Sequence, residues 1–490
     1  MPRVATVLAA VLALSAAPAS AHQPGLCLTP AERCETWSAT YDDTSIAAPA
    51  RSDQFAQQVL ANATTVFTVV RSVAMTPDRP SDATSSAVIV AYDRVSGSVR
   101  WTARERSRVY FSPHNATLSP DGSRLYLTSA AYDGWPIGKV DSRIVTTAYS
   151  TASGTVEWSS SWDGRPDAVD NPKGVVVSPD GRSVFVTGVT TAVAGDLDYV
   201  TLAYRASDGR SLWADVYDGV GGGGTDAPFG IAVSPDGQVL AVTGWSAGVV
   251  EYDADYGTVA YSLRGRGGKR LWTARYDGLG VDKSDRGNAV AIDGDRVYVT
   301  GDSYGASGYD YATVAYALSS GQQVWDARWS GGRGGFNAAT AVAAAGGRVV
   351  VTGQSTAASA DDGNDTGTVV LDAATGAQRW AASFGPVRHD GFARGLALSP
   401  DGATAYVVTL ETPIVKYTAM SRLGLVAYDV ATGAVRWQTF LDAALTESLK
   451  GADVAVSPDG SVAVVGDYTR SADPLKPPTQ NVYDVVTAVF

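Results

Sequence analysis

Eight tryptophans recur along the chain at a nearly constant spacing of roughly 53 to 64 residues. Each falls in the last of four short, strand-like segments that repeat with the same period. The eight residues are Trp37, Trp101, Trp158, Trp213, Trp272, Trp325, Trp380 and Trp437. A fixed period of this length predicts one closed or stacked body in place of several separate domains, although the chain has 490 residues.

One clear repeat shows the four segments. Its predicted strands are 230–233, 239–244, 256–261 and 269–276, and the turn Ser234-Pro235-Asp236-Gly237 joins the first two. No long segment has helical periodicity. Counting the second strand of each repeat gives eight copies, near Val66, Leu125, Val184, Val239, Val297, Val349, Ala405 and Val462. We therefore expect an all-β fold, an eight-bladed β-propeller with four-stranded blades.

The two ends of the repeat region predict how the ring closes. The segment around Trp37 is a lone last strand, whereas the C-terminal segment 483–490 stops one strand short of a complete blade. Pairing the two would remove the exposed sheet edges of an open ring, which invite aggregation. We expect residues 35–490 to form a single propeller whose last blade is completed by the N-terminal strand.

The first residues indicate export. Arg3 is followed by an apolar run over 4–17 and by the small residues Ala19-Ser20-Ala21, so residues 1–21 are expected to be a signal peptide. The run is too short to span a bilayer, so no transmembrane span is expected. We predict a secreted protein. In an exported chain, Cys27 and Cys34 are expected to form a disulfide within an N-terminal tail over 22–34.

Charge narrows the class of partner. The formal net charge is −12, and acidic surfaces repel phosphate backbones, so no nucleic-acid partner is expected. A monomer is expected.

Three repeats resemble a known family. The segments 90–101, 370–380 and 427–437 share an aspartate, then Thr-Gly or Ser-Gly, then tryptophan, and they look like the docking motif of the eight-bladed quinoprotein (PQQ-type) propellers. The resemblance implies that the tryptophans stack between adjacent blades. It also implies calcium, PQQ, a catalytic aspartate and a disulfide between adjacent cysteines. This chain has no adjacent cysteines, so PQQ and other cofactors are not expected.

The middle repeats carry a second resemblance. Tyr276-Asp277-Gly278 and the segments 299–304 and 309–316 are similar to the bacterial β-propeller (SBBP-type) repeats of exported proteins. This resemblance implies the same fold and leaves the activity open.

Two sets of aspartates recur. One begins the third strand, in the pattern Asp-x-x-Thr, at Asp198, Asp255, Asp310, Asp365 and Asp484. A hydrogen bond from each carboxylate to loop amides or to the threonine would support the fold. The other set precedes the first strand, and we expect it to ring one mouth of the central channel. Its members are candidate ligand-binding residues, with calcium as the candidate cation: Asp170, Asp226, Asp285, Asn337 and Asp390.

No singular catalytic constellation emerges from the sequence. There is no Gly-x-Ser-x-Gly nucleophile elbow and no His-Glu-x-x-His motif. The longer acidic loops all lie on one face of the predicted ring, where binding sites concentrate. We therefore expect a binding scaffold for a protein, glycan or small ligand. The alternative is a propeller enzyme at the channel mouth, either a degenerate PQQ-type dehydrogenase or a lyase or hydrolase.

Overall fold

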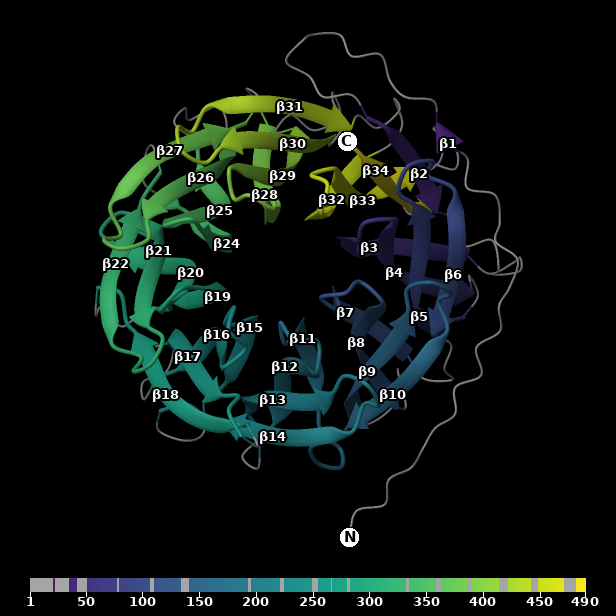
Figure 1. Cartoon of the computed structure of the whole chain (residues 1–490), viewed down its shortest axis with the longest axis horizontal. Helices are drawn as coiled ribbons and strands as arrows, with labels where there is room; N and C mark the ends of the chain where they lie inside the picture. Colours follow the sequence, from purple (N-terminus) through teal and green to yellow (C-terminus); the bar gives the residue numbers. More distant parts are fainter. Residues whose placement is uncertain are drawn as a thin grey trace.

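Eight four-stranded antiparallel sheets stand around a central axis in the computed structural model of the chain (Figure 1). The described residues are 21–22, 35–41, 51–76, 79–105, 110–133, 141–192, 195–220, 224–248, 254–265, 267–279, 283–331, 335–357, 363–385, 389–413, 422–441, 448–470 and 482–490. Within them there is no helix, and thus no helix long and apolar enough to cross a membrane. The predicted eight-bladed propeller is confirmed.

In the first seven blades the strands run from the axis outward in chain order. Blades one to four comprise β3 (Arg51–Ala61), β4 (Thr65–Thr76), β5 (Arg79–Asp93) and β6 (Val99–Glu105); β7 (Tyr110–Leu118), β8 (Arg124–Asp133), β9 (Asp141–Ser150) and β10 (Val156–Trp162); β11 (Asn171–Val177), β12 (Ser183–Thr191), β13 (Leu197–Arg205) and β14 (Ser211–Tyr217); and β15 (Asp226–Val233), β16 (Val239–Ala247), β17 (Ala254–Ser262) and β18 (Lys269–Tyr276).

Blades five to seven follow the same order. They comprise β19 (Arg286–Asp293), β20 (Arg296–Gly305), β21 (Gly308–Ala317) and β22 (Gln323–Trp329), with β23 (Gly335–Phe336) added parallel to β21; β24 (Ala338–Ala345), β25 (Arg348–Thr356), β26 (Asn364–Asp372) and β27 (Gln378–Phe384); and β28 (His389–Leu398), β29 (Thr404–Pro413), β30 (Arg422–Asp429) and β31 (Val435–Leu441).

The eighth blade joins the two ends of the chain, as predicted. Its inner strands are β32 (Ser448–Val456), β33 (Val462–Arg470) and β34 (Val482–Val489), and its outer strand is β2 (Trp37–Tyr41). The register pairs Trp37 with Val489 and Tyr41 with Val485. The short strand β1 (Ala21–His22) extends the same sheet beyond β2. Cys27 and Cys34 lie outside the described residues, so their disulfide stays a prediction.

Each tryptophan of the repeat packs across a blade boundary. The indole of Trp37 lies against Gly97 of blade one, where an added Cβ would come within 2.7 Å of the ring, and its Nε1–H donates to the carbonyl of Arg94 at 2.8 Å. Trp158 meets Gly209 and the carbonyl of Ala206 in the same way. These glycines have positive φ, near 70°, so both the turn and the indole require glycine.

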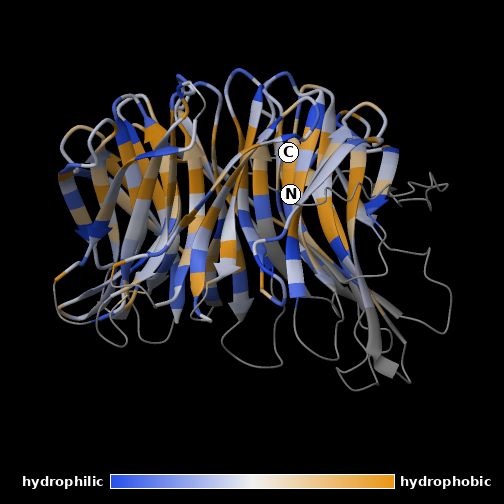
Figure 2. Ribbon diagram, turned by 90° about the horizontal axis from the view of Figure 1, so that it is seen from below, coloured by the Kyte–Doolittle hydropathy of each residue, from blue (hydrophilic) through white to orange (hydrophobic). Residues whose placement is uncertain are grey.

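The core is divided into eight main apolar clusters, each shared by two neighbouring blades. At the closing boundary, Trp37 and Val489 of blade eight pack with Val66, Val90 and Tyr92 of blade one. Figure 2 shows the hydrophobic residues concentrated in the bodies of the strands and hydrophilic residues at both ends of the ring. Because apolar burial occurs mainly between blades, closure of the ring contributes to the stability of every blade.

One predicted strand boundary differs. The fourth strand of the reference repeat is 269–276 as predicted, but its first strand begins at Asp226 instead of Gly230. A register shift between Pro228 and Gly230 places Phe229 in a β-bulge, which interrupts the alternation of side chains. Equivalent shifts occur in the innermost strand of all eight blades.

Candidate functional site

The residues predicted to ring the channel mouth lie at the beginning of the innermost strands, but most are buried. Asp226 and Asp285 are 1% and 2% exposed. Asp226 accepts hydrogen bonds from the amides of Gly219 (2.8 Å) and Ala247 (3.2 Å). Asp285 repeats this with Gly278 (2.6 Å) and Tyr304 (2.8 Å). In each case the hydrogen bonds of the carboxylate connect the link from the preceding blade with the end of the second strand in the carboxylate's own blade.

The other members occupy related corners. Asp170 is fully buried and accepts a hydrogen bond from the Gly164 amide at 2.7 Å. Asn337, also fully buried, accepts from the Thr356 amide at 3.0 Å and donates to the Ser330 carbonyl at 3.0 Å. Asp390 is partly exposed and accepts from the Asn364 amide. The expectation of an open acidic ring needs correction, because these groups are used first as caps of buried loop corners.

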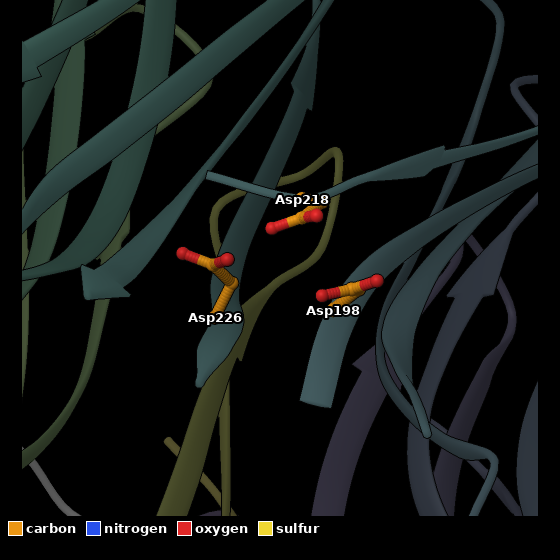
Figure 3. Close-up of side chains that lie close together, drawn as sticks. All are labelled: Asp198, Asp218 and Asp226. Atoms are coloured by element: carbon orange, nitrogen blue, oxygen red, sulfur yellow. The ribbon is translucent and has the colours of Figure 1, made fainter. Parts of the chain in front are cut away.

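Carboxylates converge at two of the blade boundaries. At the boundary between blades three and four, one oxygen of each of three aspartates lies within 4.8 Å of the others. These are Asp198, Asp218 and Asp226, and we call this set the 3/4 triad (Figure 3). The aspartates 255, 277 and 285 form the equivalent 4/5 triad one blade further on. In each triad one aspartate begins the third strand of a blade, one lies in the link, and one begins the next blade. The central member is exposed and the outer two are buried.

The 4/5 triad is accompanied by two arginines. Arg275 on β18 forms an ion pair with Asp255 and donates to the carbonyl of Ala247 at 3.0 Å. Arg328 on β22 bonds Ser303, and its charge works against the rise in the pKa of Asp285 that burial causes. The buried negative charge at this boundary is therefore partly compensated.

The 3/4 triad lacks the equivalent of one of these arginines. In the sheet register, Gly257 pairs with Arg275 in blade four and Ala312 pairs with Arg328 in blade five, whereas Val200 pairs with Val216 in blade three. Arg275 reaches the neighbourhood of Asp226 by a 3.4 Å contact with Ser246. No arginine takes the position facing Asp198.

Asp198 shows the effect of that difference. Its side chain is 5% exposed, and its Oδ1 atom is buried with no hydrogen-bond partner in the described part of the chain. Burial, followed by the charges of Asp218, Asp196 and Asp226, raises the pKa of Asp198 to about 7. Burial also raises the pKa of Asp226, against the hydrogen bonds from Ser246, Gly219 and Ala247. The 3/4 triad thus holds negative charge that its surroundings compensate poorly.

Two of the Asp-x-x-Thr threonines form hydrogen bonds across the sheet. Thr258 and Thr313 pair with threonines of the adjacent second strand at 2.9 Å, through hydroxyl–hydroxyl hydrogen bonds to Thr243 and Thr300. Two aspartates of the same motif, Asp198 and Asp255, belong to the triads between blades, and Asp310 meets Arg328 of its own blade at 3.2 Å. The repeated pattern therefore positions carboxylates between blades, in addition to supporting the sheet.

The innermost strands carry side chains at their bulged positions that differ from blade to blade. The bulged positions of the innermost strands whose side chains are described are Gln57, Lys173, Phe229, Asn288, Thr340 and Arg394. None of these six is a carboxylate. Paired carboxylates, as an acid–base hydrolase would need, are thus absent from this ring of described residues.

These residues do not fit the PQQ and calcium that the family resemblance implies. Within the described ranges, the only acidic groups with the spacing of a metal site are the two triads, and both lie between blades. The described bulged positions offer no carboxylate that could hold a calcium ion beside a cofactor in the channel. We therefore derive no step through PQQ.

Exposed apolar side chains gather on one sector of the ring. Of the ten large hydrophobic side chains that are exposed among the described residues, eight lie between residues 212 and 336, in blades three to five and the link to blade six. They are Leu212, Val216, Val220, Phe229, Leu271, Leu279, Val324 and Phe336. We call this set the apolar sector. The remaining two are Val95 and Val435.

The apolar sector coincides with a change in the docking turn. In blades one, six and seven, the residue before the tryptophan is an arginine that pairs with the aspartate of the motif, as Arg100 does with Asp93 at 2.6 Å. In blades three to five the same position holds Leu212, Leu271 or Val324, each more than 40% exposed. The aspartate of the motif is also absent from these three blades, where Arg205, Ser262 or Ala317 takes its position, so an exposed apolar residue stands where the other blades have an ion pair.

An aromatic group extends the sector onto the loop face. Tyr309 lies between Tyr304 and Phe336, with ring centroids 5.4 Å and 5.5 Å away, and Lys283 lies over the ring of Tyr304 at 5.7 Å. Sequence reasoning did not identify this group, nor Asp218 as a member of the triad. The recurring aromatic-Asp-Gly link at Tyr217-Asp218-Gly219 and Tyr276-Asp277-Gly278 was the available signal.

Comparison with known proteins gives one match to a family model. Residues 257–470 match the family model described as outer membrane protein assembly factor BamB. No curated protein matches the chain in sequence. Similar solved structures include BamB from Moraxella catarrhalis, with 12% identity over 89% of this chain and 98% of the other and a TM-score of 0.48.

Two further structures have comparable scores. Sqt1 from Chaetomium thermophilum is 12% identical over 89% of this chain and 96% of the other, with a TM-score of 0.49. The quinohemoprotein alcohol dehydrogenase from Comamonas testosteroni is 12% identical over 90% and 75%, with a TM-score of 0.46. The resemblance of the middle blades to SBBP-type repeats stays a prediction. The match over 257–470 and the ring of eight blades confirm the predicted likeness of this chain to the PQQ-type, BamB-like propellers.

Proposed function

We propose that this chain is an exported, non-catalytic scaffold that binds a partner protein through the apolar sector and the adjoining loop face. The observation that carries the proposal is the unequal distribution of exposed apolar side chains, eight of ten of which lie between residues 212 and 336. Exposed apolar residues that are scattered singly need no explanation, whereas a concentration on one sector marks an interaction surface.

The form of the sector favours a protein over a small ligand. Leu212, Leu271 and Val324 lie on the outer strands of three successive blades, and Val220 and Leu279 lie in the links at the loop face. A surface extended over several blades can be covered by another macromolecule, whereas small ligands bind in concave sites. The aromatic group of Tyr304, Tyr309 and Phe336 supplies side chains of the kind that anchor protein interfaces.

Charge suggests the complement that the partner presents. The chain has a net charge of −12, and the link residues Asp218 and Asp277, beside Val220 and Leu279, are exposed. A partner with apolar residues surrounded by basic ones would match this surface, because complementary charge raises the rate of encounter and selects the orientation.

Substitution of the sector tests the proposal. The triple variant Leu212→Ser, Leu271→Ser, Val324→Ser removes the outer part of the sector, and Val95→Ser, Val435→Ser is the matched control outside it. Site-directed photo-crosslinking in the producing cells should give one discrete adduct in the unsubstituted protein and the control, and weaken it at least tenfold in the triple variant. Equal adducts in all three proteins would contradict the assigned surface.

Export has its own test. If residues 1–21 are a signal peptide, the protein recovered outside the cytoplasm should begin at His22. Fractionation with N-terminal sequencing measures this directly. A protein that is retained in the cytoplasm with Met1 in place would contradict the proposed export while leaving the binding surface open to the crosslinking test.

A further inference from the structure

The 3/4 triad stands out because it repeats a geometry without repeating its counter-charge. Three carboxylates meet at both boundaries, with one oxygen from each within 4.8 Å of the others. In blade four, Arg275 pairs with the aspartate that begins the third strand, and in blade five Arg328 does the same. In blade three the register position of these arginines is Val216. The fold thus places a positive charge beside this aspartate in two blades and omits it in a third.

Asp198 supplies the second observation. It is 95% buried, its Oδ1 has no hydrogen-bond partner in the described part of the chain, and its carboxylate points toward Asp218 and Asp226 (Figure 3). A buried ionised carboxylate without a partner is costly, so it calls for a proton or a cation. Asp196 adds a fourth acid nearby, and its Oδ1 is also buried without a partner in the described ranges.

The geometry fits a divalent cation. Calcium binds carboxylate oxygens at about 2.3 to 2.6 Å, so two oxygens on one ion lie at most about 5 Å apart. The oxygens of the triad satisfy this limit. Asp226 is held in place by the amides of Gly219 and Ala247, and the exposed position of Asp218 leaves a route from solvent. Calcium tolerates irregular coordination completed by water, which suits a site with three to four carboxylates on one side.

We propose that the 3/4 triad binds one calcium ion, which clamps the third strand of blade three to the link and to the first strand of blade four. The ion takes the place that the guanidinium groups of Arg275 and Arg328 hold in the next two blades. The 4/5 triad, whose charge is already compensated by these arginines, does not bind calcium in the same range. This inference does not rest on the proposed partner.

Paired substitutions in the full secreted chain test the site. After treatment with a chelator, the protein is titrated with calcium chloride, and in parallel with magnesium chloride, by isothermal calorimetry and by thermal unfolding. We expect one calcium per chain, with a dissociation constant of about 0.1 to 1 mM as in extracellular calcium modules. The unfolding midpoint should rise with calcium because the ion binds the folded state.

The matched variants are Asp218→Asn in the 3/4 triad and Asp277→Asn in the 4/5 triad. Both residues are exposed and lie at equivalent link positions, so neither change disturbs the core. Asp218→Asn should weaken calcium binding at least tenfold, and Asp277→Asn should leave it within twofold. Asp198→Asn should abolish calcium binding. If Asp198→Asn fails to fold, Asp218→Asn still tests the site.

Three results would overturn the proposal. The first is an absence of calcium binding up to 10-fold above the expected dissociation constant. The second is two equivalent ions per chain, and the third is an equal loss of affinity in Asp218→Asn and Asp277→Asn. Stronger binding of magnesium than of calcium would contradict the assignment of calcium to this site.

Discussion

The 3/4 and 4/5 triads consist of aspartates at equivalent positions, with oxygens within the same 4.8 Å limit, but they differ in the residue that faces the first aspartate. Asp255 meets Arg275, whereas Asp198 meets no guanidinium in the described part of the chain, where Val216 occupies the corresponding position. In a repeat protein, shared features describe the scaffold, and a feature that one copy lacks shows where its chemistry has changed. The difference of one side chain therefore separates a closed structural corner from a candidate cation site.

Apart from this charge difference, the 3/4 and 4/5 boundaries should be packed alike, and substitution of their tryptophans tests this. Trp213 packs on Gly268 across the 3/4 boundary, and Trp272 packs on Gly321 across the 4/5 boundary. Trp213→Ala and Trp272→Ala should each lower the free energy of unfolding by about 3 to 5 kcal/mol, because each leaves a cavity between blades. Chemical denaturation without calcium measures both losses. A loss below about 1 kcal/mol in only one variant would show that the boundaries differ in packing as well as in charge.

The pH dependence of stability separates the triads next. Because burial raises the pKa of Asp198 to about 7 in the folded state, above its unfolded value, the folded protein holds this proton more firmly. The contribution of this proton to the free energy of unfolding is fully present below about pH 4 and is lost as the pH rises through 7. We expect Asp198→Asn to reduce this loss by about 2 kcal/mol, half of the full linkage value, because water near Asp218 screens the charge.

Denaturant midpoints at pH 4, 5.5, 7 and 8.5, measured on the unsubstituted protein and Asp198→Asn, give the difference. Asp121→Asn is a suitable control, because hydrogen bonds from Ser119 and Ser123 lower the pKa of Asp121 to about 2, so it changes little over this range. Calcium should restore the stability that the unsubstituted protein loses above pH 7. Parallel curves for the unsubstituted protein and Asp198→Asn would contradict the assigned role of this carboxylate.

Removing the arginine should convert the 4/5 triad into a copy of the 3/4 triad. Arg275→Gln removes the ion pair of the buried Asp255 and should cost about 1 to 2 kcal/mol, less than a fully buried pair because Arg275 is 25% exposed. Added calcium should recover part of this loss and raise the stoichiometry toward two ions. Calorimetry checks the number of ions, and an unchanged number would mean that charge alone does not define the site.

The reverse exchange should have the smallest effect. Val200→Ala, Val216→Arg gives blade three the alanine and arginine that blade five has at Ala312 and Arg328. The rise in unfolding free energy on adding calcium should fall by about 1 kcal/mol, since the guanidinium takes the place of the ion. Val200→Ala alone, which carries the cost of the cavity without the charge, should keep its response to calcium.

Much of the fold could be predicted from the sequence, because it depends on local signals that repeat. The turn residues around Asp236-Gly237 and the spacing of the tryptophans fixed the number of blades and the closing strand. The start of the first strand at Asp226 could not, because the bulge at Phe229 breaks the alternation of apolar residues on which such predictions depend.

The candidate site was only partly predictable. Asp226 was identified from its recurrence, but its burial and its bonds to the amides of Gly219 and Ala247 are tertiary features. The approach of Asp198 to Asp218 depends on the sheet register and on the path of the link between two blades. The apolar sector depends on which side of the outer strand each residue takes, which composition does not reveal.

The most direct measurement is the location of the ion itself. Crystals grown with calcium chloride, with X-ray data collected to record its anomalous scattering, show where calcium binds in the folded chain. We predict a peak between Asp198, Asp218 and Asp226, with oxygen distances of about 2.3 to 2.6 Å, and none between Asp255, Asp277 and Asp285. Peaks of equal height at both triads, or a peak at neither, would contradict this prediction.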